Sequence, residues 1–144
     1  MPDFGRWTSN GGDPSLNEIN RTDQFLDALR DAYKRIPQRH PYYPGAQDRY
    51  ETWVNANKDK VETYGNDSGG ILPWTFIPKL DPKDSENICF TQESFCSVQA
   101  ETGLEADDAT DFLQKAVVFC NETLWGTLNA CILVHPSTEK QISS

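Results

Sequence analysis

Apolar residues recur at helical spacing in three stretches of the chain, and each stretch predicts an amphipathic helix with one face turned toward a core. The first begins at Thr22, whose side chain is able to cap a helix, and ends before Pro37. The second has its apolar residues between positions 46 and 54, and Pro44 is expected at its first helical position. The third covers residues 107–121, and its wide apolar stripe consists of Ala109, Phe112, Leu113, Ala116, Val117 and Cys120.

Three other stretches have the composition of β-strands. Residues 71–77 are mostly apolar, but Pro73 lies within the run and Pro78 follows it, so we expect an edge strand or an extended segment. Residues 95–102 predict a strand whose mixed alternation does not fix which face points inward. Residues 130–134 are continuously apolar, which predicts a strand buried on both faces. The last two strands enclose the third helix in a βαβ unit, which predicts an α/β fold with an open parallel sheet flanked by helices.

The chain has 144 residues, which is enough for one domain. Residues 1–20 are rich in Gly, Asn, Asp, Ser and Pro, and we expect them to form a flexible lead-in before a domain over residues 21–144. The four cysteines follow no zinc-binding spacing and are expected to be reduced thiols. Cys120 and Cys131 fall on predicted core faces, where cysteine behaves as a small apolar residue.

The charge balance narrows the range of partners. There are 13 basic and 22 acidic residues, and the net charge of -9 is expected to repel nucleic acid and anionic lipid. No stretch approaches the roughly 20 apolar residues of a membrane span, and the first residues do not resemble a secretory signal. We therefore expect a cytoplasmic chain that binds neither nucleic acid nor a membrane.

Motifs with a known mechanism do not identify a catalytic or metal site. His40 and His135 do not stand near a serine or cysteine in a triad pattern, and Cys96 has no visible base beside it. The acidic residues between 101 and 111 lack the spacing of a calcium loop and are more easily explained as favourable charge at a helix start. We therefore predict no catalytic residue and no metal ligand from the residues alone.

Two segments at the ends of the expected βαβ unit resemble the aldehyde dehydrogenase superfamily. Residues 92–98 read QESFCSV and resemble its E-E-x-F-G-P-V segment. Residues 121–130 read NETLWGTLNA and resemble its N-x-T-x-Y-G-L-x-A segment. The two occur in the family's order, with a helix of about the family's length between them, and the resemblance extends over about residues 22–138.

This resemblance implies an interior slice of the catalytic domain of an enzyme that oxidises an aldehyde to an acid with NAD or NADP. It implies that Glu93 holds the ribose hydroxyls next to the nicotinamide and that Phe95 packs near the nicotinamide ring. Cys96 and Ser97 replace the glycine and proline of the family's motif. The family's nucleophilic cysteine belongs to a separate upstream segment, to which Cys96 does not correspond.

We therefore expect a truncated chain that has no dehydrogenase activity alone, because covalent catalysis fails without its nucleophile. The residues that choose between NAD and NADP would lie outside this slice, and the sequence does not identify the aldehyde. A slice would also leave apolar faces uncovered, and such faces favour marginal stability and self-association.

A second hypothesis is a non-catalytic interaction protein that keeps a degenerate dehydrogenase slice as a scaffold. Residues 2–7 read PDFGRW and resemble the P-x-F-G-x-W core of plant NOI-type interaction segments. A flexible lead that carries Phe4 and Trp7 would then act as a docking peptide that folds on binding.

Overall fold

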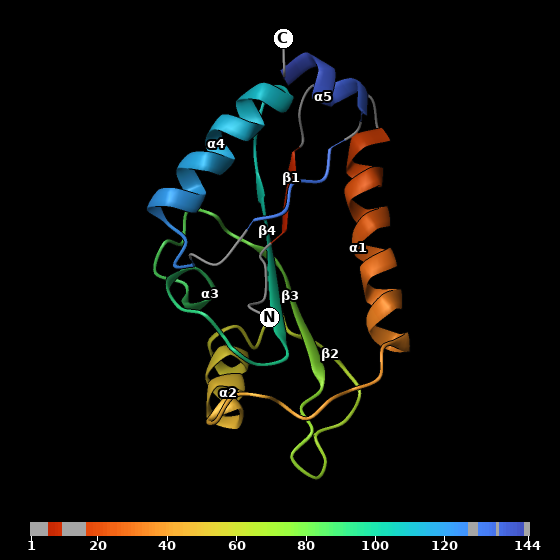
Figure 1. Cartoon of the computed structure of the whole chain (residues 1–144), viewed down its shortest axis with the longest axis vertical. Coiled ribbons are helices and arrows are strands. Elements are labelled where there is room, and N and C mark those ends of the chain that lie inside the picture. Colours follow the sequence, from red (N-terminus) through yellow and green to blue (C-terminus); the bar gives the residue numbers. More distant parts are fainter. Residues whose placement is uncertain (1–5, 10–16, 127–129, 135, 143–144) are drawn as a thin grey trace.

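An open, mixed β-sheet forms the centre of the chain (Figure 1). The computed structural model describes residues 6–9, 17–126, 130–134 and 136–142. The sheet order is β1-β4-β3-β2. The strands β1 (Arg6–Ser9), β4 (Val98–Leu104) and β3 (Trp74–Leu80) are parallel, whereas β2 (Glu62–Tyr64) pairs antiparallel with β3. The expected α/β architecture with flanking helices is confirmed, but the sheet is mixed rather than parallel.

Helices lie on both faces of this sheet. The long helix α1 (Asn17–Arg35) lies along one face. On the other face lie α2 (Ala46–Ala56), α3 (Ile88–Thr91) and α4 (Ala109–Glu122), as Figure 1 shows. A last helix, α5 (Pro136–Ile142), contacts α4. Within the described ranges, no helix combines the length and the apolar character needed to cross a membrane.

Two apolar clusters hold the three layers together. On one face, Leu26 and Tyr33 of α1 pack with Phe76 of β3. The next residue along β3, Ile77, points to the opposite face, as strand geometry requires, and joins a larger cluster that connects α2, α3 and α4 to the sheet. The buried members of that cluster are Ala46, Tyr50, Trp53, Leu72, Ile77, Leu80, Phe90, Val98, Leu104 and Phe119. Consecutive residues of one strand thus anchor helices on both faces.

The position of β3 corrects the prediction that its prolines confine it to an edge. This strand lies between β2 and β4. Pro73 precedes its first residue, and Pro78 lies at the register shift between Ile77 and Leu80. Pairing with β2 has already ended there. A proline has no N–H to donate, so a central strand tolerates one only where the regular hydrogen-bond ladder is interrupted.

Side chains of β4 replace the missing ladder contacts at this irregularity. The backbone at Lys79 adopts a positive φ of 55°, and its N–H donates to Oε2 of the buried Glu101 at 2.8 Å. The Thr102 hydroxyl donates to the Leu80 carbonyl at 2.6 Å. Buried backbone groups require such partners. Glu101 is therefore a structural residue of the sheet.

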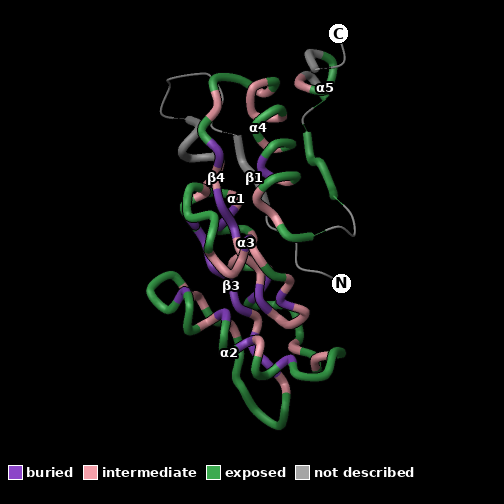
Figure 2. Tube along the Cα trace, turned by 90° about the vertical axis from the view of Figure 1, so that its left-hand side faces the viewer, coloured by how far each residue is buried: buried purple, intermediate pink, exposed green. Residues whose placement is uncertain are grey.

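The apolar run at residues 130–134 does not form a strand. Ile132 and Leu133 are 71% and 84% exposed, and Cys131 is exposed as well. Figure 2 shows this exposed stretch leading into α5. The predictions of a buried strand, of a core position for Cys131 and of a βαβ unit ending here are therefore wrong. Composition gives the apolar character of a run, but a strand also needs a neighbour to pair with.

A parallel pair does form earlier in the chain, where α3 lies in the connection between β3 and β4. The three predicted helices are confirmed, with different boundaries. Thr22 lies inside α1 rather than at its cap, and Pro44 precedes the N-cap residue Gly45 instead of opening α2. Gly45 has φ 74°, a conformation that glycine adopts at little cost.

Two parts of the lead that was expected to be flexible form regular secondary structure. Arg6–Ser9 form β1 and pair with β4, and the residues from Asn17 onward belong to α1. Residues 1–5 and 10–16 lie outside the described residues, and so do four of the six residues of the proposed docking peptide, residues 2–5. Trp7 lies in β1 and is the register partner of Thr102.

Candidate functional site

The loop between α3 and β4 carries both residues that the resemblance singles out. Glu93 and Phe95 are separated by Ser94 alone, and both are half-buried. Asn87 fixes the start of α3 because its side chain accepts a hydrogen bond from the Cys89 N–H at 3.1 Å. The loop follows this short helix directly and then enters β4 at Val98. Its ends are therefore held by regular structure on both sides.

The turn after α4 lies against this loop. The Trp125 N–H donates to the Phe90 carbonyl in α3 at 2.6 Å. A Cβ built on Gly126 would lie 3.8 Å from Oε1 of Glu93. The structure thus brings Gly126 of one segment close to Glu93 of the other, although residues 99–120 separate the two segments along the chain.

Among the described residues, the Glu93 carboxylate has neither a hydrogen-bond donor nor an ion-pair partner. The neighbouring Gly126 has no side chain that would cover it. A carboxylate with free lone pairs accepts hydrogen bonds well from hydroxyl groups, and two neighbouring hydroxyls can bind its two oxygens together.

Phe95 is held in an unusual backbone conformation. Its φ of 45° is in the left-handed region, which few residues other than glycine adopt. The Arg49 guanidinium in α2 donates to the Ser94 carbonyl at 2.8 Å and to the Phe95 carbonyl at 3.4 Å. The ring of Phe95 also meets that of Tyr43 edge to face, with centroids 5.0 Å apart. Sequence reasoning identified Phe95 but missed Arg49 and Tyr43.

The cysteines do not form a reactive centre with this loop. All four are free. Burial raises the pKa of the Cys89 thiol to about 12 and also raises the pKa of Cys120. Both thiols therefore stay protonated near neutral pH, and a protonated thiol is a poor nucleophile. Cys96 packs against the larger apolar cluster. His40 is exposed, and His135 lies outside the described residues.

Three of the acidic residues between 101 and 111 have structural roles. Besides the buried Glu101, Asp108 is the N-cap of α4, and its side chain accepts from the N–H groups of Thr110 and Asp111. Asp111 pairs with Lys115 at 2.7 Å, which lowers the pKa of the carboxyl and raises that of the lysine. In the part of the chain that the structure describes, no group of three or more His, Cys, Asp or Glu side chains is arranged to hold a metal.

A cleft of about 630 Å³ lies between α4 and the carboxyl end of β4. Leu104 and Phe119 contribute apolar surface to it, and charged residues of both signs, among them Asp81 and Lys83, also line it. Crevices at the carboxyl ends of parallel strands commonly bind ligands. The mixed charges here do not select one chemical class.

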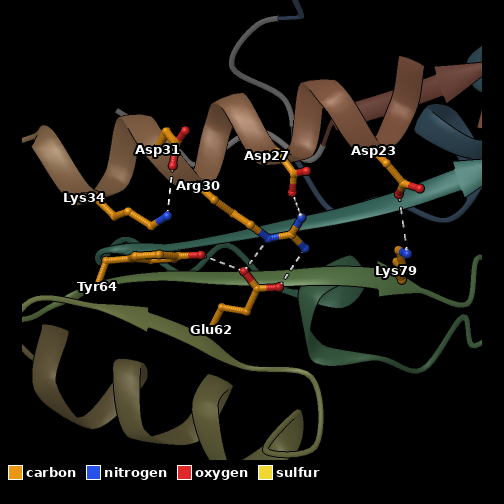
Figure 3. Close-up of polar contacts among 8 residues, drawn as sticks. All are labelled: Asp23, Asp27, Arg30, Asp31, Lys34, Glu62, Tyr64 and Lys79. Atoms are coloured by element: carbon orange, nitrogen blue, oxygen red, sulfur yellow. Dashed lines mark hydrogen bonds and ion pairs between the residues drawn. The ribbon is translucent and has the colours of Figure 1, made fainter. Parts of the chain in front are cut away.

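A cluster of polar side chains around Arg30 connects α1 to the sheet (Figure 3). Arg30 donates from Nε and Nη2 to both carboxylate oxygens of Glu62 in β2, each at 2.8 Å, and from Nη1 to Asp27 at 2.9 Å. Tyr64 donates its hydroxyl to the same Glu62 at 2.7 Å. The hydrogen bond from Arg30 lowers the pKa of Glu62, whereas burial, followed by the Glu62 carboxylate, raises the pKa of Tyr64 to about 12.

Glu62→Gln is expected to lower the free energy of unfolding at pH 7 by about 1–2 kcal/mol, because bonds to charged groups contribute ~1.5–3 kcal/mol and this pair is partly exposed. The native pKa of Glu62 lies below its unfolded value of about 4.3. Its contribution is therefore complete above that unfolded value and is lost as the pH falls through the native pKa. Urea unfolding at pH 7 and about pH 3 checks both statements.

The difference in the free energy of unfolding between Glu62→Gln and the unaltered chain should be smaller at the lower pH. Glu86→Gln is the matched control, because Glu86 is an exposed carboxylate, and it should change stability by less than about 0.5 kcal/mol. Equal differences for Glu62→Gln at both pH values would show that the carboxylate charge does not stabilise the fold.

Comparison with protein-family models, with curated proteins and with solved structures finds no match to this chain. The fold and the loop geometry are therefore the basis for proposing a function.

Proposed function

We propose that this chain is part of the catalytic domain of an NAD(P)-dependent aldehyde dehydrogenase, and that its loop at Glu93 and Phe95 contacts the nicotinamide half of the cofactor. The observation that carries the proposal is the position of the segment after α4, where Trp125 hydrogen-bonds to Phe90 at the start of this connection and Gly126 lies close to the Glu93 carboxylate. These are the two segments that resemble the dehydrogenase superfamily. A shared site gives a physical reason for both segments to keep their sequence pattern.

The residues of the loop fit such a cofactor. Glu93 is half-buried, its carboxylate has no partner among the described residues, and the residue beside it, Gly126, has no side chain. Its two oxygens can accept the neighbouring hydroxyls of a ribose. Phe95 offers an aromatic ring against which a nicotinamide can pack. The bound nicotinamide would supply the hydride-accepting chemistry.

The role of this chain is therefore binding and orientation. Glu93 orients the ribose, Phe95 limits where the ring can lie, and the α3–β4 connection holds both side chains. The two buried or half-buried thiols with raised pKa values are poor candidates for covalent attack on an aldehyde. We accordingly expect no NADH formation from an aldehyde by the pure chain, and measurable turnover would contradict this.

The test is a ligand-observed NMR titration with nicotinamide riboside, which carries the nicotinamide ring and both ribose hydroxyls. We expect weak binding by the unaltered chain and about tenfold weaker binding by Glu93→Gln, the ratio that corresponds to about 1.4 kcal/mol. Glu86→Gln removes the same charge from an exposed site and should bind like the unaltered chain. Equal affinity of all three chains would refute the proposal.

A second candidate is a non-catalytic interaction protein, which the apolar surface near the end of the chain favours. Val117, Val118, Trp125, Ile132 and Leu133 are all at least half exposed. Exposed apolar groups concentrated in one part of a chain are typical of a contact surface. If the chain is an interaction protein, it should bind a partner protein, and Glu93→Gln should leave that binding unchanged. If it is a dehydrogenase domain, it should bind nicotinamide riboside.

A further inference from the structure

The loop of the proposed cofactor site contains a strained residue. Phe95 has a backbone φ of 45°, although its side chain is bulky. A left-handed conformation costs such a residue free energy, so it persists only where the surrounding structure holds it. Strained residues of this kind concentrate at binding and catalytic sites. The question is which groups hold Phe95.

Arg49 is placed to hold it. The guanidinium extends from α2, which belongs to a different part of the chain, and donates to the two successive carbonyls of Ser94 and Phe95, at 2.8 Å and 3.4 Å. A guanidinium is a rigid, planar group with several N–H donors, so it can fix two acceptors relative to each other. A lysine ammonium in the same place is a single flexible point charge.

The surroundings of Arg49 leave room for this contact. A Cβ built on Gly45, at the start of α2, would lie only 3.3 Å from Nη1 of Arg49. Because Gly45 has no Cβ, it does not crowd the Arg49 guanidinium. The Tyr43 ring, two residues before Gly45, packs edge to face on the Phe95 ring. The segment that leads into α2 and the first turns of α2 therefore contact both the backbone and the ring of Phe95.

We propose that Arg49 is a positioning residue that holds the Glu93–Phe95 loop in the conformation required for binding the nicotinamide riboside part of the cofactor. This inference rests on the proposed function of the loop. Arg49 acts through the carbonyls of Ser94 and Phe95, and Glu93 and Phe95 make the contacts with the ligand.

The test compares Arg49→Ala, Arg49→Lys and the unaltered chain in two NMR measurements. The first is the intraresidue Overhauser effect between the amide and Hα protons of Phe95, which is strong in a left-handed residue because the two protons are close. The second is the titration with nicotinamide riboside. Arg30→Ala is the matched control, since it removes the same type of side chain from α1, on the opposite face of the sheet.

Arg49→Ala is expected to lose the strong Overhauser effect at Phe95 and to bind the riboside about tenfold more weakly, a ratio typical of losing one or two hydrogen bonds. Arg49→Lys should give values of both measurements between those of Arg49→Ala and those of the unaltered chain. Arg30→Ala should lower the urea midpoint but change neither readout. If Arg49→Ala does not fold, Arg49→Lys decides the question by a smaller change in the same direction.

The inference is overturned if Arg49→Ala keeps the Overhauser effect of Phe95, or if it loses that effect and binds the riboside as well as before. If the unaltered chain binds no riboside, the proposed function fails separately. Loss of the Overhauser effect in Arg49→Ala would then still support Arg49 as the residue that positions the loop, and its retention would overturn that role.

Discussion

Replacing Phe76 with alanine is expected to lower the free energy of unfolding by about 3–5 kcal/mol, the usual cost of removing a large buried ring. The Phe76 side chain is 0% exposed. It packs with Leu26 and Tyr33, and its ring centroid is 6.0 Å from that of Tyr33. Since this cluster joins α1 to the sheet, with Phe25 and Leu29 of the same helix packed against it, the cavity would weaken the attachment of the helix.

A loss of that size is a large share of the ~5–15 kcal/mol that stabilises an ordinary domain. Urea unfolding followed by circular dichroism measures it, with Tyr42→Ala as the control. Tyr42 is 90% exposed, so its truncation should cost less than about 0.5 kcal/mol. A loss below about 1 kcal/mol for Phe76→Ala would mean that α1 does not depend on this cluster.

Self-association of the chain is the second large effect that we expect. The exposed apolar side chains of Ile132 and Leu133 are close in sequence to the exposed Trp125, and burying each aliphatic side chain in a contact between copies stabilises that contact by up to ~1.5–3 kcal/mol. Ile132→Ser combined with Leu133→Ser should therefore raise the dissociation constant by at least about tenfold.

Sedimentation velocity over a series of protein concentrations measures this change. Tyr42→Ser also removes an exposed apolar side chain, but from a different part of the chain, and should leave association unchanged. A sedimentation coefficient of the unaltered chain that does not depend on concentration would contradict the expectation. Equal association of the unaltered chain and the double variant would show that another surface makes the contact.

The helices could be predicted from the sequence because their signal is local. In α1 and α4 the apolar residues repeat at the helical spacing. Asp108 caps the N-terminus of α4, close to where the sequence predicts that this helix begins. The buried side chain of α4 was nevertheless missed, since Phe119 is buried while Val117, placed on the predicted stripe, is half exposed. A wide stripe does not reveal which part of it meets the sheet.

The strands could not be placed so well, because a strand depends on its neighbours. Residues 130–134 have the composition of a buried strand but are exposed, and the proline-containing β3 is central because Pro78 coincides with an irregularity in pairing. The short β1 and β2 carry too few residues to show a pattern. These outcomes depend on contacts between segments that are distant in sequence.

The same distinction applies to the candidate site. Glu93 and Phe95 lie in one short motif and could be identified by resemblance. Arg49 could not, since it lies 45 residues before Ser94 and reaches it only in the folded chain. The left-handed backbone of Phe95 also leaves no trace in the sequence, because a phenylalanine there gives no reason to expect it.

The most direct measurement is a titration of the ¹⁵N-labelled chain with nicotinamide riboside, followed by amide chemical shifts. If the loop and the turn after α4 form one site, the largest shifts should occur together at Glu93, Phe95 and Gly126, with the same concentration dependence. Shifts confined to other parts of the chain, or no shifts at millimolar riboside, would contradict a nicotinamide-binding role for this loop.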